Sequence, residues 1–296
     1  MSGRSWESLP RPRPGFRPGE DTRRSDGVIG FETLAESRAE DGHCAKAIRR
    51  WIPKLDPRDR AAAEGLRLKL LQAVDRPRTP PATLASSVYA RAIRQRIVGN
   101  MWPLVEDPAN SPVAFVTLLR RHMWVPADRL VGVNPRNLNK RLINDLNRAG
   151  VTAADGWLYG TLDAEFDSRR GGYDFHHHLI VSGGKVAAME RLRGLGPYAP
   201  GRSGAHEEGR RDIDRVQVKR VRDNLPDPMT YATKFRVFSV STYIGEDGTV
   251  ETGTSTRRVP QPHLTHWLLW MDRWRVSDLL ITQGLTLTAG GIRRRV

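Results

Sequence analysis

The sequence predicts an α+β fold in which helices flank a central antiparallel sheet and further helices extend from both ends. Short apolar runs rich in β-branched residues lie in the middle of the chain, joined by turn residues. Segments with helical spacing of apolar residues precede and follow them. The chain has 296 residues, of which 39% are hydrophobic, enough for one sizeable core with a helical appendage or for two modest domains.

The first third of the chain divides into an arm and a helical region. Residues 1–43 are rich in Pro, Arg, Gly and Ser, and few clustered aliphatic residues offset the entropy of ordering them. We therefore expect a disordered basic arm. Residues 44–105 are expected to form a helical accessory region, with one helical run over 44–75 that two prolines interrupt and a second over about 82–99.

Residues 106–256 are expected to hold the sheet, and residues 257–296 a helical tail. A helix is predicted from Pro135, because proline suits the first helical turn, to Gly150, a typical residue just beyond a helix end. The expected strands are 113–119, 157–166, 175–183, 215–221 and a hairpin over 236–254, with further helices at about 184–193 and from residue 227.

The charge of the chain indicates the class of partner. Lysines and arginines number 48 against 33 acidic residues, which gives a formal net charge of +15. Such an excess attracts polyanions through phosphate contacts and counterion release, so nucleic acid is the expected partner. No apolar run approaches the ~20 residues that span a bilayer, so we expect no membrane partner and a cytoplasmic location. The single cysteine, Cys44, excludes an internal disulfide and a cysteine-based zinc site.

Three consecutive histidines lie in the expected strand 175–183. Because side chains alternate across a strand, His176 and His178 share one face, while His177 lies on the other with apolar neighbours. Two neutral imidazoles and a carboxylate make a site for a divalent ion that can polarise a phosphoryl oxygen. A pair of solvated histidines on a sheet edge is the structural alternative.

The carboxylate is expected from the preceding strand, which carries Asp163 and Glu165 on one face. We expect the turn between the two strands to be centred near residues 170–171. Antiparallel pairing then places Asp163 opposite His178. The same register places Glu165 opposite His176. Asp163 is favoured as the ligand because it follows a buried apolar stretch, and Glu165 is the alternative.

A candidate nucleophile lies in the segment DPMTYATKF, where Asp227 and Pro228 indicate the start of a helix. Tyr231 and Lys234 are three residues apart and would share a face of that helix. A phenol is a weak nucleophile at its ordinary pKa, so a neighbouring ammonium and a metal-polarised phosphate would supply the activation. A half-buried tyrosine beside a surface lysine is the structural alternative.

In order and spacing, Phe115–Leu119, the histidine strand and the Tyr231–Lys234 pair resemble the three motifs of the HUH endonuclease superfamily, particularly the rolling-circle replication initiators (Rep proteins) of plasmids and phages. The resemblance covers about residues 110–245. It implies a ferredoxin- or RRM-like sheet, a Mg²⁺ or Mn²⁺ ion, and single-stranded or extruded origin DNA as substrate. One departure is His177, which stands where the family has a hydrophobic residue and leaves a shifted ligand pair open. A second is the single tyrosine in the third motif.

The expected function is therefore site-specific nicking and rejoining of DNA to initiate rolling-circle replication of a mobile element. His176, His178 and Asp163 would hold the metal. Tyr231 would attack, forming a 5′-phosphotyrosyl link, and Lys234 would steady the developing charge. A host helicase would unwind the DNA, since the chain has no Walker-type phosphate loop. A non-catalytic basic DNA-binding protein and a hydrolytic metal-dependent nuclease are the alternatives. The residues expected to hold the DNA backbone are Arg169, Arg170, Lys219, Arg220 and Arg222.

Overall fold

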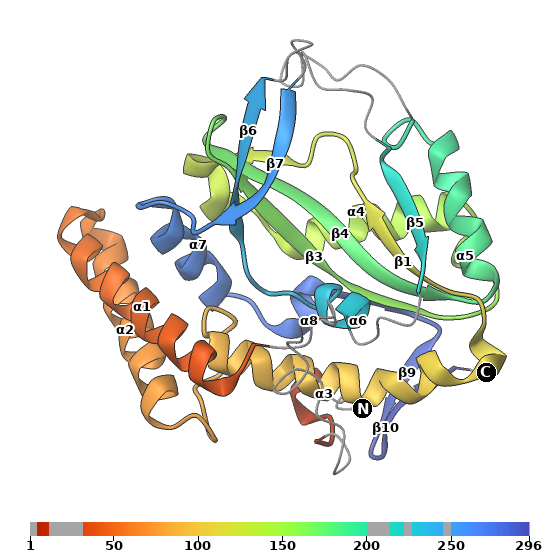
Figure 1. Cartoon of the computed structure of the whole chain (residues 1–296), viewed down its shortest axis with the longest axis horizontal. Coiled ribbons are helices and arrows are strands. Elements are labelled where there is room, and N and C mark those ends of the chain that lie inside the picture. Colours follow the sequence, from red (N-terminus) through yellow and green to blue (C-terminus); the bar gives the residue numbers. More distant parts are fainter. Residues whose placement is uncertain (1–4, 12–31, 200–213, 222–226, 245–249, 296) are drawn as a thin grey trace.

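The computed structural model describes residues 5–11, 32–199, 214–221, 227–244 and 250–295. It confirms the α+β class, with a sheet flanked by helices (Figure 1). In the described residues eight strands form one sheet in the order β5-β1-β4-β3-β6-β7, and β2 and β8 pair with β4 and β3. Neighbouring strands are antiparallel except β3 and β6, which are parallel. The strands are β1 (Val113–Leu118), β2 (Trp124–Pro126), β3 (Leu158–Asp167), β4 (Gly172–Ser182), β5 (Val216–Arg220), β6 (Phe238–Ile244), β7 (Val250–Arg257), β8 (Leu280–Gln283) and the separate pair β9 (Leu285–Thr288) and β10 (Gly291–Arg294).

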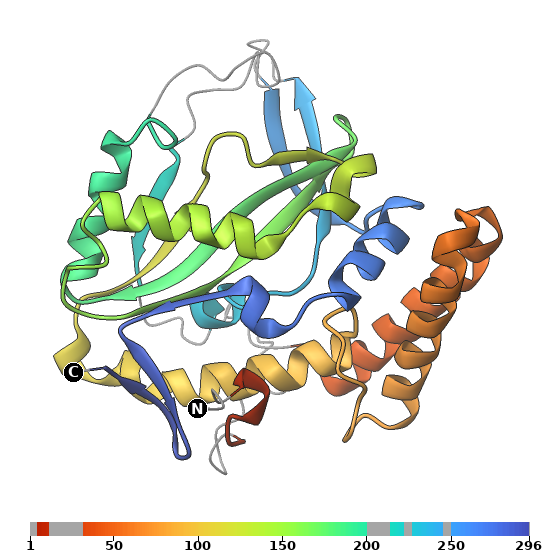
Figure 2. The same ribbon diagram turned by 180° about the vertical axis from the view of Figure 1, so that it is seen from behind.

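Helices lie on both faces of this sheet. Helices α4 and α5 cover one face, and α6 lies on the other, above the long helix α3 (Figure 1). Figure 2 shows the molecule from behind, with α4 in front of the sheet. The helices are α1 (Leu34–Trp51), α2 (Pro57–Asp75), α3 (Ser87–Glu106), α4 (Pro135–Arg148), α5 (Gly184–Met189), α6 (Asp227–Tyr231), α7 (His263–Asp272) and α8 (Val276–Leu279). Short 3-10 helices span Trp6–Ser8, Ile52–Lys54, Pro108–Asn110, Ala127–Gly132 and Glu190–Gly194.

The face of the sheet under α4 is an apolar layer. Residues of β1, β3 and β4 that point to this side pack against Leu142 and Leu146 of α4, which are fully buried. The α4 helix begins and ends as predicted: Asn134 caps it, proline occupies its first turn, and Gly150 has a φ of +71° just beyond its end. This layer leaves the opposite face of the sheet to carry polar side chains.

The turn between β3 and β4 fixes the register of the two strands that carry the candidate ligands. Asp167 pairs with Gly172, so four residues form the turn, and Gly171 takes a φ of +66° that favours glycine. Asp167 Oδ1 accepts hydrogen bonds from the backbone N–H groups of Arg169 and Arg170, at 3.0 and 3.1 Å. The side chain of Asp167 thus holds the turn one residue earlier in the sequence than predicted.

The resulting register differs by two residues from the predicted one. Asp163 pairs with His176 and not with His178, and Glu165 pairs with Asp174 and not with His176. Moving the centre of a turn by one residue moves its partners by two, and side chains alternate with a period of two. Asp163 therefore stays on the predicted face although its partner is different.

The helical region begins earlier than predicted. Helix α1 starts at Leu34, so residues 34–43 belong to a helix and not to the predicted arm. The cause is a capping box: Thr33 Oγ1 accepts from Glu36 N at 3.2 Å, and Glu36 Oε2 accepts from Thr33 N at 2.7 Å. The remainder of the predicted disordered arm lies largely outside the described residues.

Helix α3 is longer than predicted and is capped by another helix. Ser86 Oγ and Ser87 N each donate to the buried carboxylate of Asp41 in α1, both at 2.6 Å. The predicted break between the first two helices is confirmed, because α1 ends at Trp51 and α2 begins at Pro57. The Asp41 contacts join the helical region to the start of α3, which continues under the sheet.

The C-terminal segment is only partly helical. Helices α7 and α8 match the prediction, but β8 follows directly and pairs antiparallel with the first residues of β3. Gly284, with a φ of +67°, then turns the chain into the β9–β10 hairpin. The predicted helical tail is wrong beyond Leu279, because Leu280 and Ile281 form backbone hydrogen bonds with the edge of β3. The spacing of apolar residues in the sequence does not show that this edge is free to pair.

The predicted hairpin over 236–254 is confirmed as the antiparallel pair β6 and β7. The first residues of β6 also pair in parallel with the end of β3, next to Glu165. This places the segment that follows Tyr231 beside the acid-bearing strand. Among the described residues, none of the helices combines the length and apolar character needed to cross a membrane.

Candidate metal centre

The three histidines of β4 separate onto two faces as predicted. His177 is fully buried under α4, where its Nε2 lies 3.1 Å from Asn139 Oδ1, and burial lowers its pKa to about 3. His177 therefore belongs to the core. A ligand pair that includes it is ruled out, because its side chain points to the α4 face and away from His176 and His178. His176 and His178 are also buried, on the other face, with their Nε2 atoms 2.9 Å apart.

Asp163 completes a group that could hold a metal ion. One ligand atom from each of Asp163, His176 and His178 lies within 4.8 Å of the others. Asp163 Oδ2 is 3.7 Å from His176 Nε2 and 3.5 Å from His178 Nε2. Two ligands that each sit ~2.1 Å from one ion lie roughly 3.0–3.5 Å apart, so the 3.5 Å separation matches a single ion and the 3.7 Å separation is slightly wider than one requires. Glu165, the alternative acid, is not part of this group.

The imidazole orientations suit metal binding. His176 Nδ1 lies 3.1 Å from the carbonyl of Asp174, which can only accept, so Nδ1 carries the proton and the lone pair is on Nε2. His178 Nδ1 lies 3.1 Å from Thr117 Oγ1, a hydroxyl that can donate or accept. Burial lowers the pKa of His178 to about 4, which keeps the ring neutral as a metal ligand requires.

Asp163 is held as a carboxylate by the cation beside it. Burial alone would raise the pKa of Asp163, but the Lys234 ammonium, 2.9 Å from Oδ2, and the two imidazoles hold it below its ordinary value. Oδ1 accepts from the backbone N–H of Ala164 at 2.9 Å, whereas buried Oδ2 has only the ion pair and no aligned hydrogen bond. Oδ2 is thus the acceptor turned towards the histidines.

Tyr231 lies at the edge of this centre. Its side chain is 40% exposed, and its ring contacts His178 and Phe115 edge-on, with centroids 4.8 and 5.9 Å apart. Lys234 Nζ lies 4.6 Å from the centroid of the Tyr231 ring. Helix α6 ends at Tyr231, earlier than predicted, yet Lys234 remains next to the tyrosine because the chain continues in a tight turn in which Lys234 N donates to Tyr231 O at 3.1 Å.

The protonation states of this pair follow from burial and charge. Burial raises the pKa of the Tyr231 phenol, and the nearby ammonium offsets only part of that effect. Burial disfavours the ammonium of Lys234, but the Asp163 carboxylate outweighs it and the pKa of Lys234 is raised. At neutral pH the pair is therefore a neutral phenol beside a charged ammonium, and a phenolate requires further stabilisation.

Two contacts that the sequence did not indicate hold α6 over the sheet. Thr161 Oγ1 of β3 donates to the carbonyl of Ala232 at 2.9 Å, and Arg94 Nη2 of α3 donates to the carbonyl of Thr230 at 3.1 Å. Arg94 Nη1 in turn contacts both carboxylate oxygens of the buried Glu32, at 2.9 and 3.1 Å. The sequence carries no local signal for this anchor, because the burial of Arg94 follows only from the packing of α3.

The basic residues predicted to hold DNA occupy different surroundings. Lys219 is exposed and pairs in register with Phe115, on the site face, whereas exposed Arg220 pairs with Ala114 and points to the other. Arg169 is exposed in the β3–β4 turn. Arg170 is mostly buried, with its guanidinium 4.7 Å from the Trp124 ring centroid. This side chain therefore packs against Trp124 and is not presented to DNA as predicted. Arg222 lies outside the described residues.

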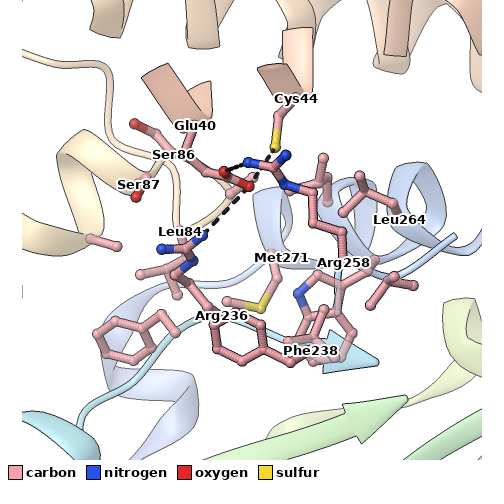
Figure 3. A pocket seen from close by; sticks show the side chains of 17 residues that line it. Glu40, Cys44, Leu84, Ser86, Ser87, Arg236, Phe238, Arg258, Leu264 and Met271 are labelled. Atoms are coloured by element: carbon pink, nitrogen blue, oxygen red, sulfur yellow. Dashed lines mark hydrogen bonds and ion pairs between the residues drawn. The ribbon is translucent and has the colours of Figure 1, made fainter. Parts of the chain in front are cut away.

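A narrow cavity of about 50 Å³ lies where the helical region meets the segment after Tyr231 (Figure 3). Its walls are mostly apolar, and Glu40 of α1 forms ion pairs with Arg236, at 3.5 Å, and with Arg258. The volume is too small for a nucleotide. We regard it as a gap in the packing between α1, α7 and the start of β6.

No protein-family model, curated protein or solved structure matches this chain. The geometry of the site therefore carries the functional argument by itself. It consists of a buried Asp-His-His group that could hold a metal ion, a half-exposed phenol in contact with one of the ligands, and an ammonium between phenol and carboxylate.

Proposed function

We propose that the protein is a metal-dependent tyrosine DNA nickase and strand transferase of the HUH type, which initiates rolling-circle replication of a mobile element. The observation that carries this proposal is the contact of Tyr231 with the ligand group. A purely structural tyrosine would be expected to bury its ring away from three convergent polar ligands, whereas Tyr231 contacts His178 while 40% of its side chain stays exposed. An incoming phosphodiester could reach both.

His176, His178 and Asp163 would hold a divalent ion, for which Mg²⁺ and Mn²⁺ fit the mixed nitrogen and oxygen ligands. When bound, such an ion polarises phosphoryl oxygens and stabilises negative charge on them. The residues also supply what the phenol needs. Lys234 lies close enough to both Asp163 and the Tyr231 ring to stabilise a phenolate by its charge.

The proposed reaction conserves the phosphodiester. The Tyr231 oxygen attacks phosphorus, a P–O bond to tyrosine forms, and the P–O bond to the 3′ oxygen breaks. The phenol proton leaves with water, and the departing 3′ oxygen takes up a proton to become a free hydroxyl. The 5′-phosphotyrosyl link keeps the energy of the broken bond, so attack by a 3′-hydroxyl reverses the steps and rejoins the strand.

The substrate proposed is single-stranded or extruded origin DNA. The ligand group lies close to the sheet surface under α6, and exposed Lys219 on the same face can contact backbone phosphates. An unpaired strand can bring one phosphate to a partly buried centre more readily than a rigid duplex. A host helicase would have to supply the unwinding, because the sequence has no Walker-type loop.

Covalent capture of DNA tests this function. Purified protein is incubated with a labelled single-stranded DNA pool containing the natural origin and with Mn²⁺, and adducts are sought by denaturing electrophoresis. We expect an adduct that disappears with chelator, with Tyr231→Phe and with His178→Ala, and that persists with Tyr89→Phe as the matched control. Cleavage without an adduct would favour a hydrolytic nuclease. Tight binding with neither product would favour a non-catalytic DNA-binding protein.

A further inference from the structure

A cleft of about 300 Å³ lies beside α3. The described residues that line it are Arg11, Arg78, Ala92, Gln95 and Arg96. They come from three separate parts of the chain: the N-terminal segment, the loop between α2 and α3, and α3 itself. Neither an acidic nor an aromatic side chain is among these described lining residues, so the cleft presents guanidinium groups to whatever enters it.

The charges of the three arginines are available to a ligand. Arg96 Nη1 donates to the carbonyls of Glu7, at 2.6 Å, and Leu9, at 3.4 Å, and these neutral acceptors orient the guanidinium without cancelling its charge. Arg11 and Arg78 are exposed, and no carboxylate within the described part of the chain forms an ion pair with either.

The neutral side chain of the cleft adds a donor. Gln95 Oε1 lies 3.5 Å from Arg91 Nη1 and accepts from it, which leaves the Gln95 amide NH₂ group to donate to a ligand. Guanidinium forks and amide donors together match the oxygens of a phosphate group, which accept several hydrogen bonds at once.

The cleft lies across α3 from the anchor of the nucleophile. Successive residues of an α-helix are rotated by about 100°, so Ala92 and Arg96 lie on the side of α3 opposite to Arg94. Arg94 faces the other way and holds the carbonyl of Thr230. A ligand that reaches both the metal centre and the cleft must pass around a helix that is ~10–12 Å wide with its side chains. Only an extended polyanion can do so.

We propose that this arginine cleft binds backbone phosphates of a polynucleotide at a second site, separate from the metal centre. The absence of aromatic side chains among the described lining residues argues against a pocket for a free nucleotide, whose base would need a stacking partner. Contacts to phosphate alone hold a strand in place without reading its sequence. The inference shares the DNA partner of the proposed function but does not depend on cleavage.

The test is equilibrium binding of labelled single strands of mixed sequence, ~8 and ~30 nucleotides long, to the full chain in the presence of chelator. The double variant Arg11→Gln/Arg78→Gln removes two charges and leaves Arg96 in place. Arg49→Gln/Arg141→Gln removes the same charge from exposed positions on α1 and α4 and serves as the control. Each protein is titrated between ~50 and ~200 mM KCl, because phosphate contacts set the salt dependence.

We expect the cleft variant to bind the long strand at least about tenfold more weakly than the control. The slope of log K against log salt should fall by about 1.4, the loss of two contacts at ~0.7 each for a single strand. The short strand cannot span both sites, so removing the cleft arginines should weaken its binding less than that of the long strand. Equal affinities of the two variants for the long strand would overturn the proposal.

A free phosphate ion would be bound by the same guanidinium groups, and inorganic phosphate at millimolar concentration tests whether the cleft holds it. If it stabilises the wild-type chain against heat but not the cleft variant, while both bind the long strand equally, the cleft holds free phosphate and the polynucleotide proposal is overturned. Tyr231→Phe separates this site from the proposed reaction. It should abolish the covalent adduct while keeping the length dependence and salt slope of the wild-type chain.

Discussion

Thr117 of β1 and His178 of β4 lie opposite each other in the sheet, and Thr117 Oγ1 is 3.1 Å from His178 Nδ1. This contact orients the imidazole of His178, which belongs to the Asp-His-His group and also contacts the Tyr231 ring. Without metal, His178 Nε2–H can donate to the lone pair of His176 Nε2, with the Thr117 hydroxyl donating to Nδ1. If His178 held a metal ion through Nε2, its Nδ1 would carry the proton and the Thr117 hydroxyl would accept the hydrogen bond. A hydroxyl is suited to both states because it can donate and accept.

Thr117→Val should therefore weaken metal binding with little change in shape. We expect Mn²⁺ affinity to fall about 10–100-fold, the range typical for the loss of a partner behind a ligand. Calorimetric titration with Mn²⁺ measures it, with Thr117→Ser as the control that keeps the hydroxyl. Wild-type affinity in Thr117→Val would show that the contact does not orient His178.

His177→Gln should leave metal binding intact. The His177 side chain is buried on the α4 face against Asn139, and glutamine can still donate to the Asn139 oxygen. We expect Mn²⁺ affinity within about twofold of the wild-type value, because no ligand changes, although the melting temperature falls. His178→Gln is the matched variant on the other face and should lose Mn²⁺ binding in the same titration. A parallel loss in both variants would contradict the assignment of His177 to the core.

Arg94 should act as a positioning residue for Tyr231. Arg94→Met removes the donor to Thr230 O and leaves buried Glu32 without this ion pair, which we expect to cost about 3–5 kcal/mol of stability. The double variant Glu32→Gln/Arg94→Met removes the buried charge and should recover most of the melting temperature. If Arg94 positions α6, the double variant still forms the DNA adduct slowly while binding Mn²⁺ normally. Full recovery of the adduct rate would mean that the role of Arg94 is stability alone.

Asp41 should make the stability of the helical region depend on pH. Burial raises the pKa of Asp41 to about 6, although Ser86 Oγ and two backbone N–H groups donate to the carboxylate. A carboxyl whose pKa is higher in the folded than in the unfolded chain favours folding below its unfolded value, near 4, and loses that contribution as the pH rises through about 6.

The comparison with Asp41→Asn isolates this effect from the other acids. From pH 4 to pH 8 the wild-type chain should lose about 2.4 kcal/mol of unfolding free energy relative to the variant, which follows from ~1.4 kcal/mol for each pH unit between the two pKa values, reduced because unfolded Asp41 is already partly ionised at pH 4. Urea unfolding at several pH values measures this difference. A constant difference between the two proteins would mean that Asp41 titrates alike in the folded and unfolded chain.

The candidate site was predictable where local geometry decides it. Side chains on a strand alternate by covalent structure, so the sequence alone could assign His176 and His178 to one face and His177 to the other. The same alternation made Asp163 robust: a register error of two residues changed its partner but not its face. The position of Tyr231 next to the candidate metal ligands was predicted only through the family resemblance, and in the structure the Tyr231 ring contacts His178.

Contacts between distant segments were decided only by the tertiary structure. Helical spacing could not show that Leu280–Gln283 extends the sheet, because the strand exists only through its hydrogen bonds to β3. In the sequence Arg94 is indistinguishable from the other basic residues of its helix. Its hydrogen bond to the carbonyl of Thr230 exists only because α3 packs beneath α6. The sequence by itself thus determined which side chains share a face, since that follows from backbone periodicity. Packing decided which faces meet, since strand register and helix docking depend on hydrogen bonds and burial between residues far apart in the chain.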